Sequence, residues 1–346
     1  MAVHRINPIT DARWSELVER HPAATVFHTS EWLQTLRQTY RFEPFVLTTT
    51  PPGFPLTNGI PFCQVSNWLG RRRLVSLPFS DHCSPLVDEA DQMIEVLTDL
   101  KENCEREQWK NIELRAGDTV IPDSLSFEQG STFWWHKLDL RLSLDQIFDN
   151  FHKDCIQRKI QRAEREQLRQ EQGRSEELLN KFYHLLLKTR RRHGLAPQPY
   201  TWFRNLVACL GDKAQIHIVS KADRPVAGIL TLRHKQSLVY KYGCSDAKFN
   251  QLGGMQMLLW SAIQDGKREQ CLDLDLGRSD IDQDGLITFK DRWGATRTRL
   301  AYQVYPPRNS EAARSTSHPM FSKLLFAWMP DSLLAASGRA LYKYMG

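Results

Sequence analysis

A two-glycine turn is the first place in the sequence where residue types suggest chemistry. The segment QLGGMQ covers residues 251–256 and lies between a predicted strand and a predicted helix. Gly253 and Gly254 allow a tight turn, and a helix amino terminus offers unpaired N–H groups and a partial positive charge. With Met255, they predict a cofactor site for a phosphate or pyrophosphate group. The alternative is a tight turn that holds no ligand.

The segment GRSDIDQDGLITFKDRWGA, residues 277–295, gathers the strongest set of charged candidates. Lys290 could stabilise charge that develops on a phosphate or an oxyanion. Arg278 and Arg292 could hold a phosphate of the cofactor. Carboxylates could accept the proton of an attacking amine, and the candidates are Asp280, Asp282 and Asp291. A polar hairpin without chemistry is the alternative.

Part of the same segment has the spacing of a calcium-binding loop. Acidic residues and a glycine occupy its first, third, fifth, sixth and twelfth positions, namely Asp280, Asp282, Asp284, Gly285 and Asp291. The aspartate at the twelfth position is shorter than the usual glutamate, and LDLDLG before it is typical of a strand rather than a helix. We therefore expect no metal, with calcium as the weaker alternative.

Arginines form a second candidate surface. Arg158, Arg162, Arg165 and Arg169 are spaced to share one face of a predicted helix, and a cluster at residues 190–193 ends the next helix. Such runs are either solvated faces or surfaces for phosphates of lipid, nucleotide or tRNA. The residues predicted to bind substrate are Arg158, Arg162, Arg191 and Tyr242.

Cysteine usage indicates a reducing compartment and no thiol chemistry. The seven cysteines include no CxxC pair, and their number is odd, which disfavours a disulfide framework or a zinc ribbon. Cys83 follows His82 in SDHC, but neighbouring side chains on a strand diverge. We therefore expect Cys83 to be structural rather than a nucleophile.

The elements that must position these residues occur in one order, twice. In each half, three β-branched, apolar strands precede an amphipathic helix and a buried strand. The first set covers residues 42–50, 58–65, 72–79, 91–108 and 111–116, and the second covers 215–221, 225–234, 237–244, 253–270 and 271–277. Sequential strands pair antiparallel, whereas the strand after the helix returns parallel. We therefore expect an α/β protein with two mixed sheets, each packed with helices.

Between the halves, the sequence predicts a strand at 136–142, one helix from Ser143 to Gly173, and a second helix at 175–193. We accordingly expect an amino-terminal domain at 1–130, a second domain at 131–305, and a linker with a helical tail at 306–346.

Composition narrows the class of protein. The chain has 346 residues with a formal net charge of +6, a mild excess that suits an anionic ligand. Neither GxxxxGK[ST] nor GxGxxG occurs, which argues against nucleotide hydrolases and dinucleotide enzymes. The first residues lack the apolar core of a signal peptide, and no run approaches the roughly 20 apolar residues that span a bilayer. We therefore expect a cytoplasmic protein.

Four segments carry a family resemblance. SLDQIFDNFHKDCIQRKIQRAERE, FYHLLLKTRRRHGLAPQPYTWFRNL, LGGMQMLLWSAIQDGKREQCLDLDLGRSD and GLITFKDRWGA occur in this order. The chain resembles the Fem-type (FemAB-like) branch of the GNAT acyltransferase superfamily over residues 21–305. SLPFSDHCSPL and TRRRHGL are similar to FemAB-like proteins associated with exopolysaccharide and PEP-CTERM clusters.

The resemblance implies tandem GNAT-like domains and an acyltransferase. Such an enzyme would transfer an acyl or aminoacyl group from acyl-CoA or aminoacyl-tRNA to an amine or hydroxyl of a cell-envelope or exopolysaccharide precursor. Gly253 and Gly254 match the turn at the donor helix, and Lys290 matches the family lysine near the reacting end of the donor. The implied partners are phosphate-bearing or lipid-linked substrates and tRNA. The alternative is a non-catalytic tandem-GNAT protein that binds a polyanionic polymer or an assembly partner at the membrane.

The carboxy-terminal tail predicts two short amphipathic helices. The first carries an apolar stripe formed by Met320, Phe321, Leu324, Leu325 and Trp328, and the second, after Pro330, carries Leu333, Leu334 and Leu341. The tail could lie on the inner face of the cytoplasmic membrane or pack on the body of the protein.

Overall fold

The computed structural model describes residues 2–306, 326 and 329–344. The described residues form two compact units. Unit 1 contains residues 2–133, 300–306 and 341–344, and unit 2 contains residues 134–299, 326 and 329–340. The strands β6 (Glu128–Asp139) and β12 (Thr296–Tyr305) each contribute residues to both units.

Unit 1 is a mixed sheet with packed helices. Its strand order is β1-β2-β3-β4-β5-β12, in which β2, β3 and β4 pair antiparallel and β4 pairs parallel with β5. Its elements are β1 (His4–Ile6), α1 (Ala12–Arg20), α2 (Ser30–Tyr40), β2 (Pro44–Thr48), β3 (Ile60–Ser66), β4 (Arg72–Val75), α3 (Ala90–Arg106) and β5 (Ile112–Leu114). Apolar residues of α3 spaced at helical intervals, including Met93, Val96 and Leu100, pack against the strands in one core.

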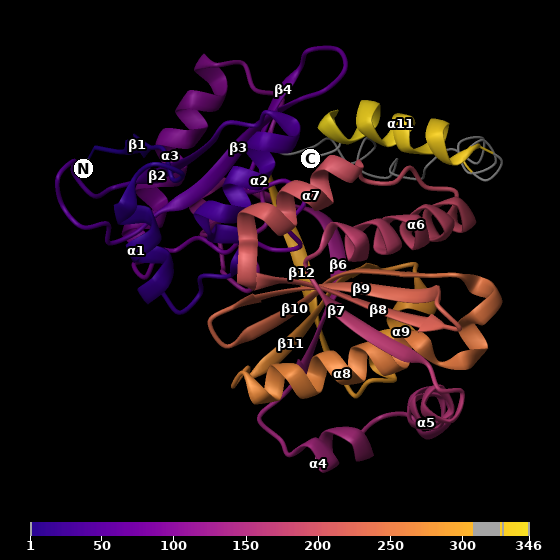
Figure 1. Ribbon diagram of the computed structural model, residues 1–346. Helices are drawn as coiled ribbons and strands as arrows, with labels where there is room; N and C mark the ends of the chain where they lie inside the picture. Colours follow the sequence, from indigo (N-terminus) through magenta and orange to yellow (C-terminus); the bar gives the residue numbers. More distant parts are fainter. Residues whose placement is uncertain (1, 307–325, 327–328, 345–346) are drawn as a thin grey trace. The chain divides into compact units, whose positions relative to one another are not determined.

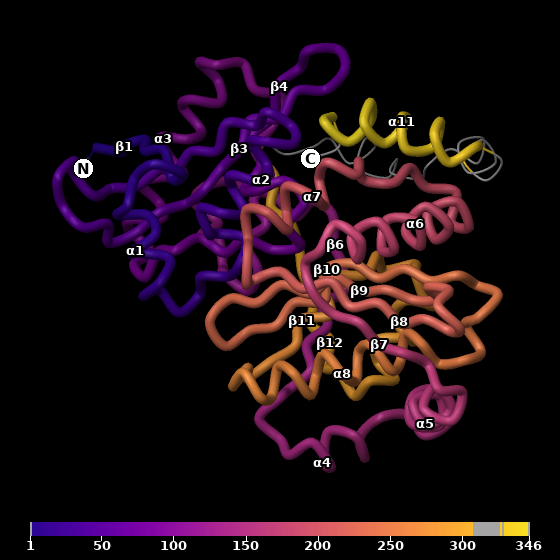
Figure 2. Tube along the Cα trace, in the orientation of Figure 1, coloured from indigo at the N-terminus to yellow at the C-terminus, as the bar shows by residue number. Residues whose placement is uncertain are grey.

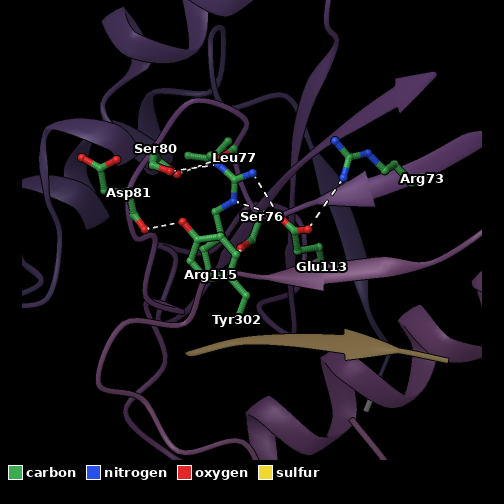
Figure 3. A network of polar contacts seen from close by, with 8 residues as sticks. All are labelled: Arg73, Ser76, Leu77, Ser80, Asp81, Glu113, Arg115 and Tyr302. Atoms are coloured by element: carbon green, nitrogen blue, oxygen red, sulfur yellow. Dashed lines mark hydrogen bonds and ion pairs between the residues drawn. The ribbon is translucent and has the colours of Figure 1, made fainter. Parts of the chain in front are cut away.

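A buried arginine organises the loop that follows β4 (Figure 3). Arg115 donates from Nη1 to the carbonyl oxygens of Leu77, at 3.1 Å, and Ser80, at 2.9 Å, and from Nη2 to Glu113 Oε1 at 2.9 Å. Leu77 has a φ of 65°, a left-handed conformation that costs energy in a β-branched or bulky residue. The buried guanidinium therefore holds a strained loop in place.

Cys83, which we expected to be structural, lies beside the imidazole of His28. Sγ of Cys83 lies 3.4 Å from Nε2 of His28, which also lies 2.9 Å from the carbonyl oxygen of Ser84. Burial raises the pKa of the Cys83 thiol. A buried, protonated thiol is a poor nucleophile, so the structural role that we expected for Cys83 fits this geometry.

Unit 2 has the strand order β6-β11-β10-β9-β8-β7. Its strands are β7 (Arg169–Gly173), β8 (Ala214–Lys221), β9 (Arg224–His234), β10 (Ser237–Ser245) and β11 (Asp273–Asp280). Its helices are α4 (Leu144–Asp149), α5 (Arg158–Arg165), α6 (Glu176–His193), α7 (Tyr200–Leu210), α8 (Gly254–Arg268), α9 (Asp284–Asp291) and α11 (Asp331–Leu341). The described residues of the two units also include short helical turns, namely η1 (Val26–His28), η2 (Asp123–Leu125), the π-turn η3 (Lys153–Gln157), η4 (Gly211–Lys213), η5 (Ala247–Leu252) and η6 (Tyr342–Tyr344).

Helices cover both faces of the unit 2 sheet (Figure 1). On one face, α5 and α8 bury Ile160, Leu258 and Ile263 against the strands. On the other face, Phe182 of α6 lies beside Gly228 of β9, where a Cβ would meet its ring at 3.3 Å. The mixed α/β class and the β-β-β-α-β order predicted twice are thus confirmed.

The prediction of one helix from Ser143 to Gly173 is wrong. Figure 2 follows the chain through α4, the turn η3 and α5, which ends at Arg165, and then into the edge strand β7. Backbone pairing of Arg169–Gly173 with β8 overrides the helical pattern. Arg169 therefore does not share a helix face with Arg158 and Arg162.

Residues 331–340 of the tail pack within unit 2, whereas residues 341–344 belong to unit 1. A Cβ at Gly338 of α11 would meet the carbonyl oxygen of Pro197 at 1.9 Å, and Arg191 of α6 contacts Asp331. The predicted apolar stripe at residues 320–328 lies outside the described residues, as does most of the predicted linker. Within the residues that the structure covers, no helix is long and apolar enough to cross a membrane.

Candidate functional site

Two parallel strands of unit 2 separate part of the way along their length. The parallel pairing of β10 with β11 covers Ser237–Val239 and Asp273–Asp275, yet both strands continue, to Ser245 and Asp280. A β-bulge between Tyr240 and Tyr242 marks the point of departure. Bulges bend a strand and can end its pairing. Beyond this point, the backbone N–H and C=O groups of β10 and β11 no longer pair with each other.

The turn predicted to bind a cofactor stands at the start of α8. Gly253 has a φ of 82°, and a Cβ there would meet the carbonyl oxygen of Lys159 at 2.1 Å. A Cβ at Gly254 would already lie 2.7 Å from Cγ1 of Val219. These contacts explain two consecutive glycines, because the turn packs directly on α5 and on β8.

A cavity of about 190 Å³ opens at this turn. Gly254, Met255 and Gln256 line it from α8, Lys159 from α5, and Phe289 from α9. The structure therefore brings the predicted cofactor residues Gly254 and Met255 next to the residue that precedes Lys290. We call this space the α8 cavity.

Lys290 is buried beneath β11. Only 2% of it is exposed, and Nζ donates to the carbonyl oxygens of Gly277, at 2.9 Å, and Arg278, at 2.8 Å. Consecutive carbonyls of a regular strand point to opposite sides, but Gly277 has a φ of 73°, which breaks this alternation. The ammonium group of Lys290 therefore binds carbonyl oxygens in the part of β11 that no longer pairs with β10.

A histidine that the sequence analysis did not select lies beside Lys290. His136 of β6 is fully buried, and neither of its ring nitrogens makes a hydrogen bond within the described residues. Its Nε2 lies 3.5 Å from Oδ1 of Asp291, whose Oδ2 lies 3.5 Å from Nη1 of Arg297. Burial, and then the charge of Lys290, lowers the pKa of His136 to about 4. The imidazole is therefore neutral near pH 7.

A buried carboxylate was also missed. Asp275 of β11 is 2% exposed, and its Oδ1 accepts hydrogen bonds from Trp135 Nε1, at 2.8 Å, and from the backbone N–H of Gly277, at 2.7 Å. It fixes the backbone just before the carbonyls that bind Lys290. The signal in the sequence was a charged residue inside the apolar run CLDLDLG, because buried charges require partners.

The other predicted residues of the 277–295 segment lie nearer the solvent. Asp280 is exposed at the end of β11, where Oδ2 accepts from Gln283 Nε2 at 2.7 Å. Arg292 is exposed at the end of α9 and its carbonyl oxygen accepts from the N–H of His152 at 2.8 Å. Arg278 is partly buried on β11.

The calcium-loop interpretation does not describe the observed conformation. Residues 284–291, which would form the last eight positions of such a loop, fold as the helix α9. A helix points successive side chains away from one centre, whereas a calcium loop wraps them around the ion. Within the described ranges, no group of three or more metal-ligating residues of the His, Cys, Asp and Glu types occurs.

The predicted substrate-binding residues are not brought together. Arg158 and Arg162 of α5 are paired with neighbours on their own segment, Asp154 at 2.6 Å and Glu166 at 3.8 Å. Arg191 of α6 donates to the carbonyl oxygen of Met329 at 3.0 Å. Tyr242 of β10 accepts at its hydroxyl from Trp202 Nε1 at 2.9 Å and packs edge-on against Phe203.

Comparisons with known proteins identify a domain family and solved structures with the same fold. Residues 151–290 match the acetyltransferase (GNAT) domain family. A crystal structure of FemX superposes with a TM-score of 0.71 at 14% identity, covering 88% of this chain and 97% of FemX. Among curated proteins, none matches the sequence of this chain.

Two further solved structures share the fold. The C-terminal domain of an Agrobacterium fabrum protein assigned as a lysylphosphatidylglycerol synthetase has a TM-score of 0.55 at 12% identity, with 87% of this chain and 92% of that chain covered. A tandem GNAT protein from the clavulanic acid biosynthesis pathway has a TM-score of 0.55 at 8% identity, with 89% and 100% covered. Residues 151–290 thus match the acetyltransferase (GNAT) domain family, and most of the chain shares its fold with FemX and with a tandem GNAT protein.

Proposed function

We propose that this protein is an acyltransferase that moves an acyl or aminoacyl group directly from a phosphate-bearing donor to an amine or hydroxyl. The observation that carries the proposal is the separation of β10 from β11 beside the α8 cavity. A gap between two parallel strands leaves backbone groups without strand partners, and these can bind a substrate as an added strand would. The GNAT match over residues 151–290 includes both strands and α8.

In this proposal the donor lies along the gap with its phosphates at the amino terminus of α8. The N–H groups at Gly254 and Met255 would face the phosphates, which suits the partial positive charge there. The acceptor then attacks the acyl carbon, the bond between the acyl carbon and the donor breaks, and the donor leaves with the electron pair. No covalent intermediate with the protein forms.

Lys290 and Asp291 would have different roles in the transfer: Lys290 would stabilise negative charge and Asp291 would accept a proton. The ammonium group of Lys290 stabilises negative charge on the tetrahedral oxygen or on the leaving group. The carboxylate of Asp291, next to the neutral imidazole of His136, would accept the proton that the acceptor loses. Asp280 is the alternative base, because its carboxylate is exposed at the end of the separated strand.

We further propose that the acceptor is a cell-envelope or exopolysaccharide precursor. The fold shared with FemX and with the lysylphosphatidylglycerol synthetase domain supports an envelope substrate. The donor would be either an acyl-CoA or an aminoacyl-tRNA. Acyl-CoA and aminoacyl-tRNA both carry phosphates at a distance from the reacting carbonyl. The buried position of Lys290 and the small α8 cavity are therefore compatible with either donor.

Thermal unfolding with candidate donors tests the proposal. A ligand that binds only the folded protein at a hundredfold excess over its Kd stabilises by about 2.7 kcal/mol. A raised midpoint with one acyl-CoA, or with charged but not uncharged tRNA, would name the donor, and Gly253→Ala should abolish that shift. If no acyl-CoA and no aminoacyl-tRNA raises the midpoint, the transferase proposal fails and a non-catalytic binding protein becomes the better account.

A further inference from the structure

A second, larger cavity of unit 2 is lined mainly by cations. Its volume is about 490 Å³, within the range of roughly 300–1,000 Å³ usual for small-molecule sites. Its walls come from α6, the start of β9, and the chain after β10. Five of its eight lining residues are Lys or Arg and one is acidic: Lys188, Arg191, Arg192, Arg224, Ser245, Asp246, Ala247 and Lys248. We call it the basic cavity.

The single carboxylate of the basic cavity holds two of its cations in fixed positions. Asp246 is buried, and its Oδ2 accepts from Lys188 Nζ at 2.9 Å and from Arg224 Nη2 at 3.2 Å. The Arg224 guanidinium also lies over the Phe249 ring, 4.9 Å from its centroid. Cations held in this way lose little side-chain freedom when they bind an anion.

The other cations of the basic cavity, Arg191, Arg192 and Lys248, give it an excess of positive charge. Arg191 contacts Asp331, whereas Arg192, among the described residues, reaches only the carbonyl oxygen of Ser245, at 3.5 Å. Within the part of the chain that the structure describes, no group accepts a hydrogen bond from Nζ of Lys248. The basic cavity therefore presents Arg192 and Lys248 to solvent without a counter-ion of their own.

The basic cavity adjoins the α8 cavity. Ser245 lines both, and Phe249, which lies under Arg224, lines the α8 cavity. We propose that the basic cavity binds a second phosphate group of the donor, separate from the phosphate at the amino terminus of α8. The assignment to the donor rests on the proposed transferase function, whereas the affinity for phosphate follows from the cavity alone. A phosphomonoester of a nucleotide and a backbone phosphate of RNA offer the same chemistry.

Calorimetric titration of the whole chain with pyrophosphate tests this site. The variant Arg192→Gln/Lys248→Gln removes the two exposed cations and leaves the buried Asp246 pairs intact. We expect its Kd for pyrophosphate to rise at least about tenfold, the equivalent of roughly 1.4 kcal/mol. The matched control is Arg71→Gln/Lys110→Gln, which removes the same charge from exposed positions of unit 1. Its Kd should stay within about twofold of the unmodified protein.

Equal losses in both double variants would show only an effect of net charge and would overturn the proposal. Absence of pyrophosphate binding by the unmodified protein would overturn it too. Adenosine 3′,5′-bisphosphate and a short single-stranded RNA, titrated separately, distinguish the two sources of phosphate, and a preference for either, lost in Arg192→Gln/Lys248→Gln, supports the site. Pyrophosphate binding with that mutational pattern, but without transfer from any donor, would leave the basic cavity in place and remove the proposed function.

Discussion

His136 and Asp291 form a pair in which Nε2 of the imidazole lies 3.5 Å from Oδ1 of the carboxylate. Asp291 directly follows Lys290, so one turn of α9 carries both the buried ammonium group and the carboxylate. The burial of the ring, and then the proximity of the ammonium group, keep the imidazole uncharged. In the proposed mechanism, the pair places a neutral imidazole beside the carboxylate that would accept a proton.

The lowered pKa of His136 predicts how stability depends on pH. Its pKa is about 4 in the folded protein and about 6.5 in an unfolded chain. The unfolded state therefore binds more protons below pH 6.5, and the stability due to neutral His136 is fully present above pH 6.5 and is lost as the pH falls towards 4. His136→Gln should reduce proton uptake on unfolding near pH 5 by roughly one proton.

Urea unfolding at several pH values between 4 and 7 measures this uptake as the slope of the free energy of unfolding against pH. The reference is the unmodified protein, whose slope near pH 5 should be larger by roughly one proton. An unchanged slope in His136→Gln would contradict the neutral, buried imidazole.

Lys290→Ala should destabilise the protein as well as stop transfer. The change leaves the carbonyl oxygens of Gly277 and Arg278 without their buried donor, and unsatisfied buried groups cost about 1–3 kcal/mol each. Lys267→Ala is the matched control, since Nζ of Lys267 donates to one carbonyl oxygen, that of Leu140, at 2.7 Å in a partly buried position. Chemical denaturation should rank Lys290→Ala clearly below Lys267→Ala, and equal stabilities would refute the structural role of Lys290.

Gly253→Ala should be far more damaging than Gly285→Ala. At Gly253 the φ of 82° and the carbonyl oxygen of Lys159 both exclude a Cβ, so we expect a loss of more than about 2 kcal/mol. At Gly285, within α9, a Cβ would meet nothing within 4 Å, and alanine should stabilise by up to about 1 kcal/mol. Denaturation midpoints of the two variants check this, and similar midpoints would be inconsistent with the packed turn.

The apolar periodicity of the sequence predicted helices and strands correctly where the local pattern and the pairing of strands in the fold agree. The strands and helices of the two repeated sets have strong apolar patterns, and the glycine pair marked a real strand-to-helix turn. The same reasoning failed at Arg169, because pairing with β8 decides its conformation and leaves little trace in the polar segment RQEQG. It also missed α9, whose acidic start imitates a calcium loop.

Part of the candidate site could not be predicted because its members come from distant segments. His136 is separated from Asp291 by more than 150 positions in the chain, and nothing near either residue indicates the other. The basic cavity was missed for a related reason: the sequence shows the arginine cluster of α6, but not that Arg224 and Lys248 come to lie beside it. Single residues with ordinary neighbours become informative only once the strands are paired.

Unit 1 offers a test of its own through Arg115. The variant Arg115→Leu removes the donors of the Leu77 and Ser80 carbonyl oxygens and leaves the carboxylate of Glu113 without its buried partner (Figure 3). Breaking a buried ion pair from one side costs about 3–5 kcal/mol, and the strained conformation at Leu77 would no longer be held. We therefore expect a large fall in the free energy of unfolding, together with faster hydrogen exchange in residues 76–84.

Arg73→Gln is the control for this prediction, because Arg73 contacts the same carboxylate from a more exposed position, with Nη1 at 3.7 Å from Oε2 of Glu113. The contact is long and Arg73 is partly exposed, so its loss should cost no more than about 1 kcal/mol, and this variant should keep the exchange pattern of the loop. A small effect of Arg115→Leu, comparable with that of Arg73→Gln, would mean that backbone pairing alone holds the loop. In that case, the left-handed residues after β4 would not depend on the buried guanidinium.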